Sequence, residues 1–226
     1  MVKFMNFLKY KIMCLFIFLI SIFIFGNLRV DALLSNLPLF GRVIYVDPGH
    51  GGRDPGAMYG KLMEKDIVLE ISNVLVDKLT KQGAIVYMTR DSDEDLSSKW
   101  DPQKKRGDLY RRIMLYKKNK ADMYLSIHLN SSYSSNDKGI EVLYNKINKN
   151  NKVLGEILIK NFDEKFYNVR ELITTDLYMY RNTTTVGVLI ECGFLSNSDD
   201  RYNLQRKSYQ EKLAVTITKS VIEYFN

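Results

Sequence analysis

The sequence predicts an α/β protein: a single layered domain with a mostly parallel central β-sheet flanked by helices. Short runs rich in β-branched and aromatic residues alternate with longer segments whose apolar residues recur at helical spacing. Such alternation is typical of helices that cross a face of the sheet between parallel strands. The chain has 226 residues, 46% hydrophobic and 26% charged, which suits one globular domain with a core of its own.

Five apolar runs have the length and the residue types of β-strands. They lie at residues 42–46, 84–89, 123–127, 140–144 and 188–190. Apolar residues at helical spacing predict helices at residues 65–82, 109–116, 153–162 and 213–222. Gly83 suits the end of the first of these helices. The second ends in the basic run 117–120, which complements the negative end of a helix dipole.

The segments between these elements are predicted from charge and from turn-forming residues. Residues 91–105 are charged and contain Asp101-Pro102, which indicates a surface loop. A second loop, rich in serine and asparagine, covers residues 130–137. Residues 166–187 are expected to be irregular, with one short strand near Tyr178.

Residues 1–33 are predicted to be a signal peptide or a membrane anchor. Three lysines precede an uncharged apolar run at residues 12–25. A spanning helix needs about 20 apolar residues and a signal-peptide core about 7–15, so the length favours a signal. The cleavage region near Val30 is poor, which keeps an uncleaved anchor as the alternative. A cleaved signal and an uncleaved anchor both predict that the rest of the chain lies outside the cytoplasmic membrane. That part consists of a linker at residues 34–41 and a folded domain at 42–226.

Charge and cysteine content exclude several other classes. The formal net charge is +7, and part of this excess lies in the N-terminal segment. No basic stripe with interleaved aromatic residues appears, so nucleic-acid binding is not expected. The two cysteines, Cys14 and Cys192, have neither a disulfide framework nor the spacing of zinc ligands.

Polar side chains that can bind a metal or transfer protons follow three of the predicted strands. The two histidines of the chain, His50 and His128, each come at or just past the end of a strand, and Glu191 follows a third. Glu64, just before the first helix, can face the same edge. Sites in α/β sheets form beyond the carboxyl ends of the strands, and two imidazoles with one carboxylate make a ligand set for catalytic zinc.

Each of these residues also has an ordinary structural interpretation. A single histidine is more often a core or surface residue than a ligand, and Glu64 could simply complement the helix dipole. Glu191 follows an apolar run, and a buried carboxylate needs a partner or a chemical task. Cys192 could be a nucleophile, but no histidine lies at a recognisable spacing, so a small buried apolar residue is the preferred interpretation.

Several short motifs together are similar to those of the zinc-dependent N-acetylmuramoyl-L-alanine amidases. They are Asp47-Pro48-Gly49-His50-Gly51-Gly52, Glu64-Lys65-Asp66, Thr89-Arg90-Asp91, Ser126-Ile127-His128-Leu129-Asn130 and Glu191-Cys192-Gly193-Phe194. The match covers residues 42–225 in order. The resemblance implies an amidase catalytic domain with Zn²⁺ ligands at His50, Glu64 and His128 and a general base at Glu191.

The compact form most resembles the spore-cortex, germination-specific branch of this family, with a single domain and no wall-binding repeats. Leu129 and the Arg106-Gly107-Asp108-Leu109 stretch point to the same branch. Gly187 is a departure, because relatives often carry proline there, and it predicts a looser backbone before the Glu191 strand.

The resemblance implies hydrolysis of the amide between the muramic acid lactyl group and L-alanine in peptidoglycan. Glu191 would take a proton from water and return it to the departing nitrogen. We expect Arg53, Asn130 and Arg181 to contact the substrate. In the cortex branch the product passes to a muramic acid deacetylase, which forms muramic δ-lactam, and the enzyme acts between the spore membranes.

The sequence leaves other functions and partners open. A zinc-dependent polysaccharide deacetylase would also use two histidines and a carboxylate, but its ligand motif differs and Glu191 has no place in it. A catalytically idle peptidoglycan-binding module would need none of the four polar residues. An activator protein, if one exists, could dock on residues 166–187 or on the 91–105 loop.

Overall fold

The computed structural model describes residues 15–22 and 37–226. Residues 15–22 are helical and belong to one unit, Met1–Pro38, and Leu39–Asn226 form a second, compact unit. No helix among the described residues is long and apolar enough to cross a membrane. The expected signal or anchor at 1–33 falls largely outside the described residues, and the expected linker at 34–41 is described only from residue 37 onward, so both stay predictions.

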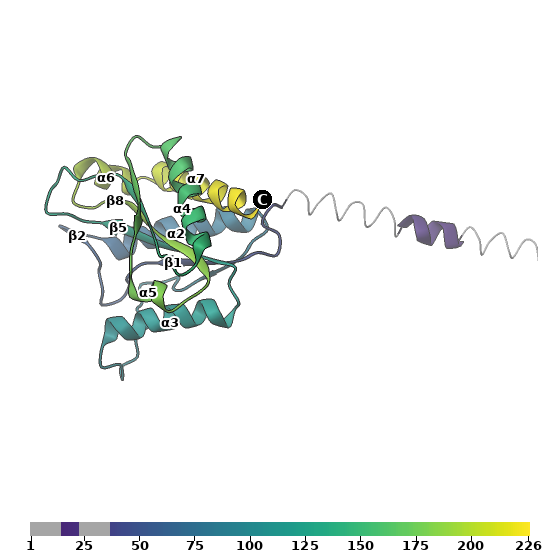
Figure 1. The fold of residues 1–226 in the computed structure, drawn as a ribbon, viewed down its shortest axis with the longest axis horizontal. Helices are drawn as coiled ribbons and strands as arrows, with labels where there is room; N and C mark the ends of the chain where they lie inside the picture. The colour runs from purple at the N-terminus through teal and green to yellow at the C-terminus, as the bar shows by residue number, and fades with distance from the viewer. Residues whose placement is uncertain (1–14, 23–36) are drawn as a thin grey trace, which may run out of the picture. The chain divides into compact units, whose positions relative to one another are not determined.

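The compact unit is built on a six-stranded sheet with strand order β4-β1-β5-β8-β6-β7. Figure 1 labels three of its strands, β1, β5 and β8. The strands are β1 (Val43–Pro48), β4 (Ile85–Met88), β5 (Met123–Asn130), β6 (Ile140–Tyr144), β7 (Val169–Thr174) and β8 (Val186–Phe194). The pairs β1–β4, β1–β5, β5–β8 and β6–β7 of this sheet are parallel, and the pair β6–β8 is antiparallel. The predicted α/β class with a mostly parallel sheet is therefore confirmed.

Helices cover both faces of the sheet because strand side chains alternate between them. The larger core packs β1, β5 and β8 against three helices: α2 (Glu64–Lys81), α4 (Lys149–Asp163) and α7 (Lys207–Phe225). The opposite face is covered by α3 (Lys104–Lys118) and the short α5 (Tyr178–Arg181) (Figure 1). Tyr45, Tyr124 and Leu189 point from successive strands into this second, smaller core.

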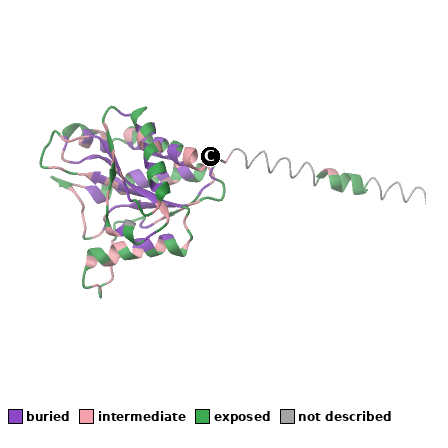
Figure 2. Ribbon diagram, viewed as in Figure 1, coloured by how far each residue is buried: buried purple, intermediate pink, exposed green. Residues whose placement is uncertain are grey.

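The buried residues follow this layering. Figure 2 shows the buried class concentrated in the sheet and on the inner faces of its helices, while the outer side of α3 is exposed. In β1, for example, Ile44 and Val46 lie in the larger core, and Tyr45 between them lies in the smaller one. Both faces of the central strands are thus covered, which explains why these strands are continuous apolar runs in the sequence.

Three features differ from the sequence-based expectations. The short strand expected near Tyr178 is wrong, because Tyr178–Arg181 is the helix α5, and the strand in this segment is β7 at Val169–Thr174. A hairpin of β2 (Met58–Tyr59) and β3 (Leu62–Met63) precedes α2, and α6 (Ser198–Leu204) follows β8. These pieces are too short to show a period, although the Asn197 side chain caps α6 by accepting from Asp199 N and Asp200 N.

Gly187 does not leave a loose backbone. It lies inside β8, opposite Tyr124 of β5, and its N–H donates to Oδ1 of the Asn151 side chain at 2.9 Å. A Cβ at this position would come within 2.4 Å of the Tyr124 ring and 2.5 Å of the Tyr124 carbonyl oxygen. Glycine therefore allows a close approach of two strands here.

Gly187→Ala is accordingly expected to destabilise the protein. The added methyl group must displace the neighbouring strand backbone as well as a ring, and overpacking of this kind costs about 1–3 kcal/mol. Urea unfolding followed by circular dichroism measures the free energy of unfolding of both proteins. An unchanged unfolding midpoint would show that the two strands have room to separate.

Candidate metal centre and catalytic pocket

The pairing of β1, β5 and β8 brings the predicted polar residues to one edge of the sheet. Pro48 is aligned with Ile127, and His128 is aligned with Glu191. His50 follows β1 in the Gly-rich turn. His128 and Glu191 lie within β5 and β8, which run on to Asn130 and Phe194, so the expectation that these residues come after the strand ends was wrong by a few positions. The common edge is as expected.

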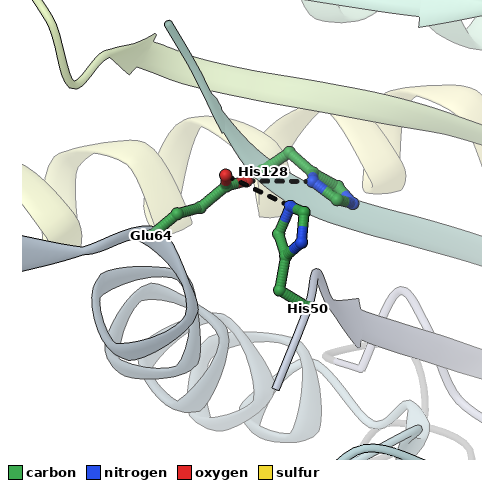
Figure 3. A group of neighbouring side chains, drawn as sticks. All are labelled: His50, Glu64 and His128. Atoms are coloured by element: carbon green, nitrogen blue, oxygen red, sulfur yellow. Dashed lines mark hydrogen bonds and ion pairs between the residues drawn. The ribbon is translucent and has the colours of Figure 1, made fainter. Parts of the chain in front are cut away.

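Glu64 contacts both histidines (Figure 3). Its Oε2 is 3.1 Å from His50 Nε2, and its Oε1 is 3.0 Å from His128 Nδ1. One donor atom from each of the three side chains lies within 4.8 Å of the others. Glu64 is the first residue of α2 rather than a residue before the helix, and the β2–β3 hairpin brings that helix start to the sheet edge.

The surroundings of Glu64 favour its carboxylate form. Burial opposes ionisation, but the hydrogen bonds and charges of His128 and His50 outweigh it and hold the pKa of Glu64 well below its usual range. The carboxylate also accepts from the backbone N–H of Ala57 at 2.8 Å and of Leu129 at 2.9 Å. Burial would lower the pKa of His50, but the hydrogen bonds and charges of Glu64 and Asp54 raise it.

Two glycines make room for this cluster. A Cβ on Gly49 would come within 2.3 Å of the His128 ring, and a Cβ on Gly56 within 2.5 Å of Glu64 Oε2. Gly56 also has φ +68°, a conformation that favours glycine. Two imidazoles and an ionised carboxylate, with the neighbouring backbone kept free of side chains, suit a divalent cation such as zinc.

Buried arginines hold the turn that carries His50. His50 has φ 60°, which is unusual for a residue with a side chain. Arg112 donates through Nη2 to the His50 carbonyl at 2.6 Å and through Nη1 to the Pro48 carbonyl at 2.7 Å. Arg90 donates through Nη2 to the Gly49 carbonyl at 2.8 Å. These guanidinium groups satisfy carbonyls that leave the sheet and fix the direction of the His50 ring.

Asp47 neutralises Arg112 beneath the site. Its carboxylate accepts from Arg112 Nη1 at 2.7 Å, Thr89 Oγ1 at 2.6 Å and Ser126 Oγ at 2.7 Å, and the residue is 1% exposed. Burial alone would raise the pKa of Asp47, but the charge of Arg112 and the three hydrogen bonds hold it below its usual value.

Asp47→Asn is therefore expected to lower the free energy of unfolding by about 3 kcal/mol at pH 7, because it removes the more deeply buried of the two carboxylates, Asp47 and Asp108, that pair with the Arg112 guanidinium. The native pKa of Asp47 lies below the unfolded value of about 3.9, so its stabilisation is present above that pH and is lost as the pH falls through the native pKa. The difference between the two proteins should thus shrink at pH 2. Urea titrations at both pH values measure it, and a difference that does not change with pH would contradict this assignment.

Glu191 is a buried carboxyl group facing the same cavity as the histidines. Among the described residues its Oε2 has no hydrogen-bond partner. Burial raises the pKa of Glu191 to about 7, and the negative charges of Glu64 and Glu141 act in the same direction against the opposing effect of the histidines. A carboxyl group with a pKa near neutrality can both accept and return a proton.

The cavity that joins these groups has a volume of about 360 Å³. His50, His128 and Glu191 line it from the sheet edge, and Leu109 of α3 and Tyr178 of α5 line it from the other side. Asp54 also lines it, with its Oδ2 3.0 Å from His50 Nδ1. Cys192, next to Glu191, is fully buried outside this lining, and burial raises the pKa of its thiol, as expected for a small apolar residue.

The three residues expected to contact substrate do not line this cavity. Arg53 pairs with Asp95 and lines a neighbouring cavity beside His50. Asn130 donates to Glu141 Oε2 at 2.8 Å, and Glu141 is also paired with Arg170. Arg181 lies at the end of α5, in a groove beside the site. Their substrate contacts stay predictions.

Sequence reasoning missed Asp54, Arg90 and Arg112 as parts of the site. Asp54 follows His50 by four residues in a turn, a spacing that carries no periodic signal. Arg90 stands in the Thr-Arg-Asp motif, where its position alone gave it no role. Arg112 lies within the predicted helix at 109–116, and a charged residue on the inward face of a helix signals a buried ion pair.

The comparisons with known proteins agree with this geometry. A sequence model of the N-acetylmuramoyl-L-alanine amidase family matches residues 44–223. The chain belongs to this amidase family. It is 41% identical over 197 residues to the germination-specific N-acetylmuramoyl-L-alanine amidase of Bacillus subtilis strain 168, covering 84% of this chain and 82% of that protein.

Solved structures of amidases share the fold. The CwlD amidase from Clostridioides difficile, solved in complex with the GerS lipoprotein, superposes with a TM-score of 0.77 at 32% identity, over 81% of this chain and 98% of that one. The catalytic domain of the amidase CwlV from Bacillus (Paenibacillus) polymyxa var. colistinus gives a TM-score of 0.72 at 28% identity, over 81% and 97%. The family's enzyme class, amide hydrolysis, therefore applies to this chain.

Proposed function

We propose that this amidase is zinc-dependent and hydrolyses the amide between the muramic acid lactyl group and the L-alanine of the peptidoglycan stem peptide. The observation that carries the proposal is the convergence of His50, Glu64 and His128 within 4.8 Å, beside a cavity that both histidines and the buried Glu191 line. In the described part of the chain, Glu191 Oε2 has no hydrogen-bond partner. A passive binding module has no need of such a group, which is costly to bury.

His50, Glu64 and His128 would hold the ion. When bound, zinc supplies Lewis acidity, which polarises a carbonyl and favours the ionisation of water near neutral pH. The chain contributes the fixed geometry. Two backbone N–H groups orient Glu64. Asp54 orients His50, and the buried arginines donate hydrogen bonds to the carbonyls of its turn.

Glu191 is proposed to move the proton. An amine is a poor leaving group and an amide a poor electrophile, so the site must both activate water and protonate nitrogen. The free Oε2 of Glu191 would accept a proton from the attacking water and then donate it to the departing L-alanine nitrogen. Its pKa of about 7 makes both transfers accessible at neutral pH.

The biological setting is proposed from the relatives. The germination-specific relative of Bacillus subtilis favours a role in spore cortex maturation, where the freed muramic acid passes to a deacetylase and becomes muramic δ-lactam. The site of action would be outside the cytoplasmic membrane, between the spore membranes, with or without an N-terminal anchor. Because the Clostridioides difficile CwlD structure contains the GerS lipoprotein, an activator protein is a further proposed partner.

Mass analysis of digested peptidoglycan tests the proposal. Purified residues 34–226 are incubated with peptidoglycan and either zinc or a chelator, and the products are analysed by mass spectrometry. We expect free stem peptides and muramic acid with an unsubstituted lactyl carboxylate, formed only with zinc. Loss of acetyl groups with the peptides retained would indicate a polysaccharide deacetylase. Bound but unaltered peptidoglycan would indicate a catalytically idle module.

A further inference from the structure

A basic groove adjoins the reaction cavity on the side formed by α3 and α5. Its volume is about 740 Å³, and it shares Lys105, Leu109 and Tyr178 with the lining of the cavity that holds Glu191. The two hollows therefore adjoin each other, and a substrate whose reacting bond lies in the cavity has the groove as its neighbouring surface. We refer to this hollow as the α3–α5 groove.

Every charged residue that lines the α3–α5 groove is basic. The full lining is Gln103, Lys104, Lys105, Arg106, Leu109, Tyr178, Arg181 and Asn182. The carboxylates Asp54 and Asp108 line the reaction cavity instead. The groove is thus a cationic surface beside a reaction cavity whose lining includes several carboxyl groups.

The contacts of these cations leave two guanidinium groups accessible. Lys104 Nζ donates to the carbonyls of Ser98 and Lys99, which ties it to the neighbouring loop. Arg106 is exposed and lies 5.3 Å from the centre of the Tyr178 ring. Arg181 is exposed, and its Nε lies 3.4 Å from an exposed carboxylate oxygen of Asp176, a weak surface pair that a ligand carboxylate can replace.

This arrangement is unfavourable for the folded protein alone. The first turn of α3 carries Lys104, Lys105 and Arg106 and has no acidic residue, although the start of a helix dipole repels cations. Like charges gathered around one groove also repel each other, and an anion bound between them would relieve both effects.

The two arms of the substrate differ in charge. The amide that is cleaved joins an N-acetylated glycan, whose nearby groups are neutral amides and hydroxyls, to a stem peptide that ends in a carboxylate. Only the peptide arm is an anion. Building on the proposed function, we propose that the α3–α5 groove binds the peptide arm, with Arg106 and Arg181 pairing with its carboxylates and Tyr178 contacting its apolar atoms. The planar guanidinium group suits such pairing because it can bind a carboxylate through two parallel hydrogen bonds.

Two substrates and one double variant test this assignment. The substrates are a muramoyl-peptide with free stem carboxyl groups and the same compound with those groups converted to amides. The wild-type enzyme should show a KM about tenfold lower for the free-carboxyl substrate, at similar kcat, and this preference should weaken as salt is added. The variant Arg106→Gln/Arg181→Gln should lose the preference, with KM for the free-carboxyl substrate raised about tenfold.

The control variant is Lys117→Gln/Lys118→Gln, which removes the same charge from exposed positions at the other end of α3. It should retain the wild-type preference. Equal KM values of the wild type for both substrates, or a preference that survives in the Arg106/Arg181 variant, would overturn the assignment while leaving the hydrolase activity in place.

Binding of the released peptide separates this inference from the proposed function. Calorimetric titration of the full domain with the stem peptide, which begins with L-alanine, requires no turnover. We expect the dissociation constant to rise about tenfold in the Arg106/Arg181 variant and for the amidated peptide. If the protein cleaves neither substrate but binds the peptide in this manner, the groove is upheld and the reaction is not. If the wild type and the variant bound both peptides with equal dissociation constants, the groove would not be the peptide-binding surface, even if the protein were an active amidase.

Discussion

Replacing Glu191 by glutamine is expected to reduce kcat on muropeptides by about 10²–10⁴-fold, the range that a general base and acid contributes. Glutamine keeps the size of the side chain but can neither accept the proton of water nor deliver one to the leaving nitrogen. Since Glu191 is not among the clustered donor atoms, bound zinc should stay close to one ion per chain. Single-turnover kinetics and metal analysis of the same sample measure both quantities.

Glu171→Gln provides a control for this variant. Glu171 is exposed on the edge strand β7, so its loss changes the net charge equally without reaching the cavity. This control should have wild-type kcat. If Glu191→Gln cleaved at the wild-type rate, Glu191 would not be the general base. If the variant had lost its zinc, Glu191 would instead be a metal ligand.

His50→Ala is expected to abolish metal binding and, with it, measurable hydrolysis. Removing one of three protein ligands leaves two donors, which hold zinc too weakly to survive dialysis. The fold should persist because the buried core of β1, β5 and β8 does not depend on the His50 side chain. Zinc content by atomic spectroscopy and the far-ultraviolet circular dichroism spectrum distinguish metal loss from unfolding.

Asp54→Asn is expected to weaken metal binding less than His50→Ala does. Asp54 contacts His50 Nδ1 but is not one of the clustered ligands. Loss of such an orienting carboxylate typically costs about 10–100-fold in metal affinity, so this protein should still bind zinc when the ion is in excess. Full zinc retention by His50→Ala after dialysis would place the metal elsewhere.

The sequence predicted the centre of the fold because its central strands are covered on both faces. Such strands are continuous apolar runs, and each of the five predicted runs overlaps an observed strand. The edge strand β7 was missed since most of its residues are exposed and its sequence mixes charged and apolar residues. The antiparallel direction of β6 also has no sequence signal, because periodicity does not record direction.

The candidate site divides in a similar way. His50, His128 and Glu191 could be placed together because strands in a parallel sheet bring their carboxyl ends to one edge. The exact place of Glu64 depends on the β2–β3 hairpin, whose strands are two residues each and leave no pattern. Arg112 reaches the His50 turn from α3, more than sixty residues along the chain. A contact of that range follows from packing and not from local sequence.

The arginine-held turn has a consequence for how the proposed zinc site would fill. Small zinc domains unfold when the ion is withdrawn, because the ion is their principal source of cohesion. Here the turn that presents His50 is secured by hydrogen bonds from Arg90 and Arg112, which are independent of any ion. The proposed zinc ion would therefore bind to a turn that is already folded, so folding and metal binding are expected to be separate events.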